Sequence, residues 1–352
     1  MPLIEAHDLR MYYELRKHIF AKPLFVRAVD GVTLSVGRGE TLALVGESGC
    51  GKTTLGKTLL RLLTPVGGQI KFYLREDDPV LEDPVVSTLA KPVEHDGGKL
   101  YEVDITYLKE KELKWFRRKA QIIFQDPYSS LDPMHTILYT LEEPLIVAGI
   151  KDRDERFERA CKVLELVKLT PPEDFINKYP HMLSGGQRQR VAIARALILE
   201  PEFIVADEPV TMLDASVRVE ILMLLRRLQE ELGVAYLYIT HDMSTAKYFA
   251  RKVAVMYAGK VVEMGDFREV VREPKHPYTQ ALIEAIPDPD PNNRFVMRKT
   301  VPGEPPNLVM PPPGCRFHPR CPVKMDVCEK EEPPVVELEH GRKVACWLYA
   351  KR

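Results

Sequence analysis

A glycine-rich loop between two patterned segments constrains this fold more than any other feature. Residues 41–46, TLALVG, predict a short buried strand, and TTLGKTLLRLL, which begins at Thr53, predicts a helix. The chain between them reads GESGCGKT and matches the pattern G-x-x-x-x-G-K-[ST]. Glycines let backbone N–H groups wrap around phosphate oxygens, and the helix N-terminus adds partial positive charge. The strand–loop–helix context therefore favours a phosphate-binding loop over a turn that merely caps a helix.

Individual side chains of this loop have expected roles. Lys52 would reach the β- and γ-phosphates of a nucleotide, and the Thr53 hydroxyl would ligate Mg²⁺. The residues expected to contact the nucleotide through the loop are Gly46, Glu47, Ser48, Gly49, Cys50, Gly51, Lys52, Thr53 and Thr54.

A second apolar run complements the loop. FIVAD, residues 203–207, predicts a buried strand that carries Asp207 to its carboxyl end, where α/β sheets bind ligands. Asp207 would hold Mg²⁺, and Glu208 would orient or polarise the attacking water. Alone, the run would indicate only a strand and a turn. Together with the phosphate loop it predicts a nucleoside triphosphatase.

The rest of the chain alternates between strand and helix patterns, which predicts an α/β fold with a largely parallel sheet. Apolar residues at helical spacing from about 134 to 180 predict a helical subdomain. The acidic stretch 75–99 predicts a solvated loop or a small β excursion. The other expected elements are strands at 26–37, 121–126 and 235–240, helices at 107–119 and 217–232, and a hairpin over 253–265 that turns at Ala258-Gly259.

Composition excludes several classes of protein. The chain has 352 residues and a formal net charge of −1, so a broad polyanion-binding surface, and hence a nucleic-acid partner, is not expected. It contains no run of 18 apolar residues, which argues against a transmembrane helix. The N-terminus lacks the basic and apolar pattern of a secretory signal, so we expect a cytoplasmic location.

A third motif gives the chain a family resemblance. LSGGQ, residues 183–187, lies before a predicted helix and between the two motifs described above. With the motifs in this order, residues 3–285 resemble the nucleotide-binding subunit of ABC transporters. The resemblance implies a P-loop NTPase core of the ABC type in residues 1–285, with an antiparallel β subdomain and a helical subdomain at about 134–183.

The resemblance also implies roles for particular residues. Its ATP sites form between two subunits, so Ser184, Gly185, Gly186 and Gln187 of one subunit would face the phosphate loop of the other. Thr211-Met212-Leu213-Asp214 departs from the family's usual Ser-Ala-Leu-Asp, and its effect stays open. The further implied roles are Gln125 beside Mg²⁺ and the membrane partner, His241 on the γ-phosphate, Asp214 in the D-loop, and Tyr13 stacked on adenine, with Tyr12 as its alternative.

Several shorter stretches narrow the branch of the family. RAVDGV, FQDPYSSLDP and HPYT resemble the oligopeptide and dipeptide importer ATPases, and GESGCGKTTLGK resembles their F-type partner. This implies a heterodimer with a homologous ATPase at the cytoplasmic face of the membrane. It also implies two permease subunits and an external substrate-binding protein. Importers of oligosaccharides or nickel are alternatives within the branch. A soluble ABC ATPase is a third, although the chain has one motif set and no sustained heptads.

The C-terminal residues 286–352 differ in composition from the rest. They hold 13 of the 29 prolines and four of the six cysteines, Cys315, Cys321, Cys328 and Cys346. Clustered thiols in a reducing compartment more often bind metal than form disulfides. Zinc usually takes C-x2–4-C pairs, which are absent here. Four thiolates also suit a [4Fe–4S] cluster, and the resemblance implies one, because tails of this family are associated with such a cluster. We therefore expect a Cys-rich extension with such a cluster. Zinc, no metal, and His318 or His340 as ligands are alternatives.

Overall fold

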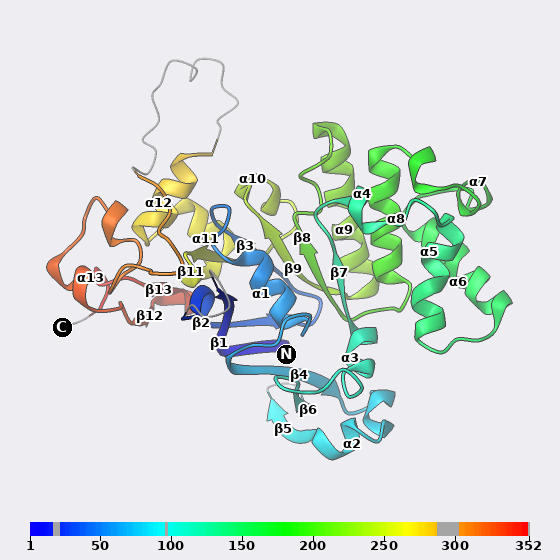
Figure 1. The fold of residues 1–352 in the computed structure, drawn as a ribbon, viewed down its shortest axis with the longest axis horizontal. Coiled ribbons are helices and arrows are strands. Elements are labelled where there is room, and N and C mark those ends of the chain that lie inside the picture. The colour runs from blue at the N-terminus through cyan, green and yellow to red at the C-terminus, as the bar shows by residue number, and fades with distance from the viewer. Residues whose placement is uncertain (17–21, 96–97, 287–302, 351–352) are drawn as a thin grey trace.

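The computed structural model describes residues 1–16, 22–95, 98–286 and 303–350. Two β-sheets and their covering helices make up these residues (Figure 1). A group of helices lies at one side of the larger sheet and the C-terminal segment at the opposite side (Figure 1). Within the described ranges, no helix has the length and apolar character needed to cross a membrane.

The larger sheet has eight strands in the order β12-β13-β11-β10-β3-β9-β8-β7. Five of them pair in parallel, as the alternation of strands and helices predicted. These five are short apolar runs, which suits strands buried on both faces. They are β10 Lys252–Tyr257, β3 Thr41–Val45, β9 Ala235–Thr240, β8 Phe203–Asp207 and β7 Ala120–Ile123.

Successive side chains of these strands enter two different cores. On β3, Ala43 belongs to a core shared with α8 (Gly185–Leu197) and α9 (Ala215–Leu232), whereas Leu44 belongs to a core shared with α1 (Lys52–Leu59). The strands are therefore covered on both faces, and their carboxyl ends stay accessible at one edge. Shorter helices on this part of the chain are α10 Met243–Ala246, α11 Phe267–Arg272 and α12 Pro277–Glu284.

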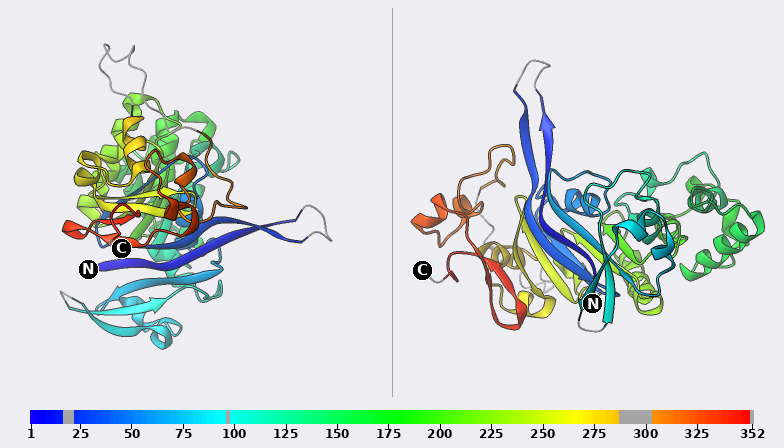
Figure 2. Two further views of the ribbon diagram at one scale, coloured as in Figure 1. Left: turned by 90° about the vertical axis from the view of Figure 1, so that its left-hand side faces the viewer. Right: turned by 90° about the horizontal axis from the view of Figure 1, so that it is seen from below.

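The smaller sheet is antiparallel, with the order β2-β1-β4-β6-β5. Its strands β1 and β2 form a long hairpin that projects from the body of the molecule (Figure 2). The predicted strand at 26–37 is confirmed as part of β2, whereas β1 was not predicted. The bounds are β1 Pro2–Leu15, β2 Leu24–Gly37, β4 Gly67–Arg75, β6 Gly98–Asp104 and β5 Lys91–His95.

The acidic stretch 75–99 contains both expected features, since residues 76–90 are turns and short helical pieces in which only Val86 is buried, and β5 is the β excursion. Asp78 caps a short 3₁₀ turn, and its carboxylate also pairs with Lys119 Nζ at 2.8 Å. The adjoining prediction of a helix over 107–119 is only half right, because the Arg61 guanidinium holds the carbonyls of Ile105 and Leu108 in an irregular connection. The elements here are η1 Pro79–Glu82, α2 Val86–Leu89 and α3 Lys114–Lys119.

The helical spacing from about 134 to 180 corresponds to helices in the structure. Thr136 caps the helix that begins at Ile137, and Asp152 caps the helix that begins at Arg153. Each side chain accepts a hydrogen bond from the backbone of the first turn. The break expected near Pro171-Pro172 lies between the helix that ends at Leu166 and the helix that begins at Glu173. The elements of this group are α4 Pro127–Ser130, α5 Ile137–Val147, α6 Arg153–Leu166, α7 Glu173–Ile176 and η2 Pro180–Met182.

The C-terminal segment completes the larger sheet. The predicted hairpin over 253–265 is confirmed, and its second strand, β11 (Lys260–Asp266), pairs with β13 (Lys343–Ala345). The predicted boundary at residue 285 therefore separates elements that share one sheet. The remaining elements of the segment are η4 His318–Arg320, α13 Asp326–Lys330, β12 Val335–Glu337 and η5 Glu339–Gly341.

Candidate nucleotide site

The phosphate loop passes so close to neighbouring backbone that two of its positions accept only glycine. Gly46 has φ +155° and Gly51 has φ +106°. A Cβ on Gly46 would lie 2.1 Å from the carbonyl oxygen of Met256, and one on Gly51 would lie 1.9 Å from that of Ala28. The glycines of the motif therefore let the loop fold tightly between β3 and α1, as the pattern predicted.

Lys52 is the charged residue of the loop. Its side chain is buried, and Nζ donates hydrogen bonds to the carbonyl oxygens of Gly46 at 2.8 Å and Glu47 at 2.9 Å. The ammonium group is thus held against the first turn of the loop by acceptors that a phosphate oxygen can replace. Its charge lies where the polyphosphate of a nucleotide is expected.

Thr53 and Asp207 meet although 154 residues separate them. The Thr53 hydroxyl donates to Asp207 Oδ1 at 3.0 Å. Burial raises the pKa of Asp207 and the neighbouring Glu208 raises it further, whereas the bond from Thr53 and the nearby lysines lower it. A hydroxyl and a buried carboxylate are the hard oxygen ligands that Mg²⁺ takes, and a cation here would favour the ionised Asp207. The pair therefore fits the predicted magnesium site.

Glu208 is the centre of the site. It has φ +46°, an uncommon conformation for this residue type, and its carboxylate accepts hydrogen bonds from Gln125 Nε2 at 3.0 Å and Thr211 Oγ1 at 3.2 Å. His241 Nδ1 lies 3.1 Å from the same carboxylate. Gln125, Glu208 and His241 follow the neighbouring strands β7, β8 and β9, so the sheet brings together three residues that the sequence only suggested separately.

The two adjacent tyrosines of β1 have different environments. The Tyr12 hydroxyl donates to the Asp30 carboxylate, and burial together with this bond raises the pKa of Tyr12 to about 12. Tyr13 is 38% exposed, and its hydroxyl lies 3.3 Å from Thr54 Oγ1 in the first turn of α1. The structure therefore places Tyr13, and not Tyr12, beside the phosphate loop with its ring accessible.

The LSGGQ motif forms the N-terminus of α8. Ser184 and Gln187 make a reciprocal capping box, with bonds of 2.9 and 3.3 Å. In the described part of the chain, no hydrogen bond of these residues reaches the phosphate loop. Asp214, at the start of α9, is exposed and makes no capping bond. The structure thus leaves Ser184–Gln187 and Asp214 apart from the phosphate loop of their own chain.

Two residues beside the site were missed by the sequence interpretation. The backbone N–H of Glu47 donates to the Tyr278 hydroxyl at 2.9 Å, and the Glu47 carboxylate accepts two bonds from Arg320, at 2.9 and 3.2 Å. Tyr278 entered the sequence interpretation only as part of the HPYT stretch that resembles the importer family. No local signal could have indicated Arg320, because 273 residues separate it from Glu47.

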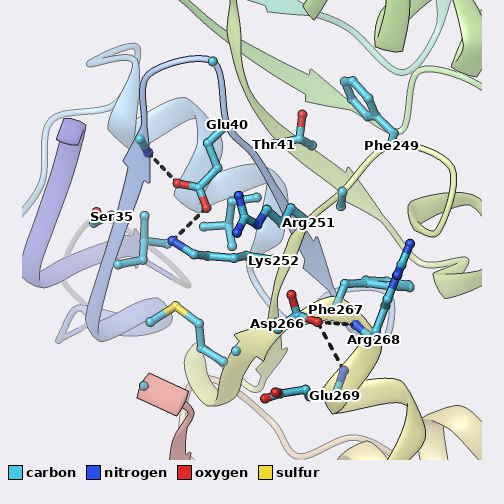
Figure 3. A pocket seen from close by; sticks show the side chains of 18 of the residues that line it. Ser35, Glu40, Thr41, Phe249, Arg251, Lys252, Asp266, Phe267, Arg268 and Glu269 are labelled. Carbon is cyan, nitrogen blue, oxygen red and sulfur yellow. Dashed lines mark hydrogen bonds and ion pairs between the residues drawn. The ribbon is translucent and has the colours of Figure 1, made fainter. Parts of the chain in front are cut away.

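A cavity of about 1540 Å³ lies elsewhere. It is lined by residues at the amino ends of β3 and β10, including Thr41 and Lys252, and by the start of α11 (Figure 3). There Lys252 Nζ pairs with Glu40 at 2.8 Å, and Asp266 caps α11. Ligands of parallel sheets bind at the carboxyl ends of the strands, so this cavity is not the nucleotide site.

The four C-terminal cysteines line one small cavity of about 10 Å³, together with His276, Phe317 and His318. The four thiols therefore lie around one cavity, and the predicted metal site stays a prediction. Residues 1–16, 22–95, 98–286 and 303–350 contain no group of three or more Cys, His, Asp or Glu side chains arranged to hold a metal ion. Burial raises the pKa of Cys315 to about 11. His340 is not among the lining residues.

Comparison with known families settles the identity of the fold. Residues 29–211, more than half of the chain, match the model of the ABC transporter family. The chain belongs to the ABC transporter family of ATP-binding subunits. Residues 262–328 additionally match the model described as the oligopeptide/dipeptide transporter C-terminal region. The chain is therefore an ABC ATPase.

The ABC ATPase has relatives that match it over nearly its full length. It is 42% identical to the dipeptide transport ATP-binding protein DppF of Haemophilus influenzae, over 98% of this chain and 96% of that protein. It is also 42% identical to the putative oligopeptide transport ATP-binding protein YkfD of Bacillus subtilis, over 99% and 96%. DppF of Escherichia coli is 40% identical over 98% and 94%.

Solved structures share its fold. The ATP-binding cassette MJ0796, in a dimeric post-hydrolysis state bound to ADP and Pi, gives a TM-score of 0.59 at 29% identity, covering 76% of this chain and 99% of that one. CbiO1 of Clostridium perfringens, part of the transporter complex cbiONQ, gives a TM-score of 0.58 at 26% identity, covering 77% and 91%. The expected P-loop NTPase core of the ABC type is confirmed.

Proposed function

We propose that this chain is the ATP-hydrolysing, energy-coupling subunit of a membrane importer of oligopeptides or dipeptides. The observation that carries the ATPase part is the convergence of Gln125, Thr211 and His241 on Glu208, beside the Thr53–Asp207 pair. The importer part is supported by the match of residues 262–328 and by relatives named for dipeptide and oligopeptide transport.

Each residue at the site has a proposed role in hydrolysis. Glu208 orients and polarises the attacking water, and His241 contacts the γ-phosphate. Lys52 neutralises the β- and γ-phosphates. Thr53, Asp207 and Gln125 would hold Mg²⁺, which would supply further charge neutralisation. Phosphoryl transfer needs little covalent chemistry from the protein, so positioning and electrostatics account for most of the catalysis. The full set of proposed nucleotide contacts is Tyr13, the loop Gly46–Thr54, Asp207, and Ser184–Gln187 and Asp214 of a facing subunit.

We further propose that the complete site forms between this chain and a homologous ATPase. Ser184–Gln187 lie at an accessible helix N-terminus, which binds anions, yet they do not reach the phosphate loop of their own chain. A dimeric state is described for the structural relative MJ0796. The heterodimer rests on the F-type resemblance of GESGCGKTTLGK. The subunit composition of the purified native complex tests the heterodimer proposal. A complex that contains only one type of ATPase chain would show a homodimer instead.

A groove of about 620 Å³ offers a place for the permease subunits. It lies between α3, β7, α5 and α8, and its lining includes Phe124 and Val147, whose apolar side chains are 39% and 83% exposed. Phe124 directly precedes Gln125, which donates to Glu208. A permease segment seated here would therefore act on the catalytic carboxylate through one residue, Gln125.

We place the complex at the cytoplasmic face of the membrane, where it would work with an external substrate-binding protein.

The importer proposal predicts a specific loss of coupling. In the native complex, dipeptides or oligopeptides should stimulate ATP hydrolysis. Val147→Asp should abolish this stimulation and permease co-purification while leaving the basal rate unchanged, because a charge in the groove opposes burial of an apolar partner. Met223→Asp, on the exposed face of α9, is the matched control. Stimulation by oligosaccharides or by nickel instead would assign the importer to those alternatives. A chain that co-purifies with no permease would be a soluble ATPase.

We propose, as a separate point, that the four cysteines of the C-terminal segment hold a [4Fe–4S] cluster. Its support is that all four thiols line one cavity. At about 10 Å³ this cavity has room for about one water molecule, so the thiols would have to move apart to admit a cluster. Zinc needs less room and is the second candidate.

Metal analysis of the purified chain decides between these candidates. Purified without oxygen, the protein should be brown, with broad absorption near ~400 nm and bound iron and sulfide. A Cys328→Ser variant should lose the colour. A colourless preparation containing one zinc per chain would favour zinc. A metal-free preparation that hydrolyses ATP at full rate would contradict both, and would leave four packed thiols.

A further inference from the structure

The second residue of the phosphate loop is held from outside the loop. Glu47 donates its backbone N–H to the Tyr278 hydroxyl at 2.9 Å. Its carboxylate accepts a forked pair of bonds from Arg320, Nη1 to Oε2 at 2.9 Å and Nη2 to Oε1 at 3.2 Å. Two-bond pairing of guanidinium with carboxylate fixes direction as well as distance. Both contacts come from the C-terminal quarter of the chain.

Arg320 is itself fixed in place. Its side chain is 8% exposed, and Nη1 also donates to the Tyr257 hydroxyl at 3.3 Å. Four residues earlier, Arg316 donates to the Asp30 carboxylate and to the carbonyl of Ala258. The C-terminal segment is therefore attached at two points to the framework that surrounds the phosphate loop.

An aromatic cluster stiffens the same region. Tyr257 lies 4.5 Å from Tyr278 and 5.2 Å from Phe317, measured between ring centroids, and Tyr278 lies 5.5 Å from Phe317. All three side chains are buried. Phe317 also lines the four-cysteine cavity, so the cavity wall packs directly against the residues that hold Glu47. Such packing leaves Arg320 little freedom to leave the carboxylate.

The charge of Glu47 explains why this contact matters for binding. A carboxylate in a loop that receives a polyphosphate repels the ligand unless a cation compensates it. Arg320 supplies that cation from the C-terminal segment, on a side chain too buried to serve as a freely moving phosphate ligand. We propose that Arg320 is a positioning residue for ATP: it cancels the Glu47 charge and fixes the loop. The C-terminal segment thereby contributes to the ATP-binding site.

ATP affinity of the isolated full-length chain tests this. Arg320→Ala should raise the Kd for ATP about tenfold, as expected for loss of a largely buried ionic partner, with a smaller change in kcat than in KM. Arg320→Lys, which keeps the charge but not the fork, should be intermediate. Lys324→Ala is the matched control, because Lys324 in the same segment pairs at 2.8 Å with Glu329 on the exposed surface, and its Kd should stay at the wild-type value.

A second substitution separates the electrostatic role from a structural one. Glu47→Gln combined with Arg320→Ala removes the uncompensated charge, so the Kd should return to within about threefold of wild type even if the melting temperature stays lowered. A Kd for Arg320→Ala within twofold of wild type, or a double variant that binds no better than Arg320→Ala, overturns the proposal. Wild-type protein that does not bind ATP would instead contradict the ATPase assignment. Neither result depends on the transported solute or on metal in the cavity.

Discussion

Glu208→Gln is expected to lower ATP turnover at least about 100-fold while ATP still binds. The amide keeps the length and nearly the shape of the carboxylate, so Thr211 and Gln125 retain an oxygen acceptor at this position. The variant loses the negative charge that we propose polarises the attacking water and that lies 3.1 Å from His241 Nδ1. Lys52, Thr53 and Asp207 are untouched, so the phosphates remain bound.

Phosphate release and ATP affinity should be measured on the same preparation. The variant should release phosphate at the background rate, and ATP should shift its elution on a sizing column to that of a stable dimer. Glu230→Gln is a suitable control, because Glu230 forms an exposed pair with Arg226 on α9, far along the helix from the site. Normal turnover by Glu208→Gln would show that the water is activated by another group.

Glu263→Gln is expected to lower the free energy of unfolding by about 3–5 kcal/mol. The Glu263 side chain is fully buried and pairs with the buried Arg342 guanidinium, with one bond of 3.0 Å from Nε. It also accepts the backbone N–H groups of Lys275 at 3.0 Å and His276 at 2.9 Å. Glutamine would turn an NH₂ donor toward these donors and leave Arg342 as a buried charge without its counter-ion.

Chemical denaturation followed by circular dichroism measures this loss. The matched control is Glu332→Gln, since Glu332 pairs with Lys260 of the same strand at 2.7 Å but on the exposed surface, where such pairs contribute less than about 1 kcal/mol. Because Glu263 joins β11 to the residue that precedes β13, local detachment of the C-terminal segment should accompany the loss. A change no larger than that of the control would mean that the pair adds nothing to stability.

Short-range chemistry explains what the sequence determined by itself. The glycine pattern and its flanking apolar runs located the phosphate loop, because only glycine fits where Gly46 and Gly51 approach other backbone. Short apolar runs located the parallel strands, since strands covered on both faces must be apolar throughout. The order of Lys52, LSGGQ and Asp207 indicated the family, which the comparison of residues 29–211 confirms.

Long-range contacts explain what the sequence left undetermined. The choice between Tyr12 and Tyr13 depends on which hydroxyl reaches Asp30 and which faces Thr54. The connection after β6 is irregular because Arg61, far upstream, holds its carbonyls. Local pattern carries no information about such partners, because folding alone brings them together.

The sequence by itself thus determined the loop, the strand that carries Asp207 and Glu208, and the class of reaction. The tertiary structure decided which side chains act together: Gln125 and His241 on one carboxylate, and Arg320 on Glu47 across 273 residues. The physical reason is that a motif fixes backbone shape over a few neighbouring residues. A catalytic or binding geometry depends instead on strand order and on charges buried between distant segments, which exist only after the chain has packed.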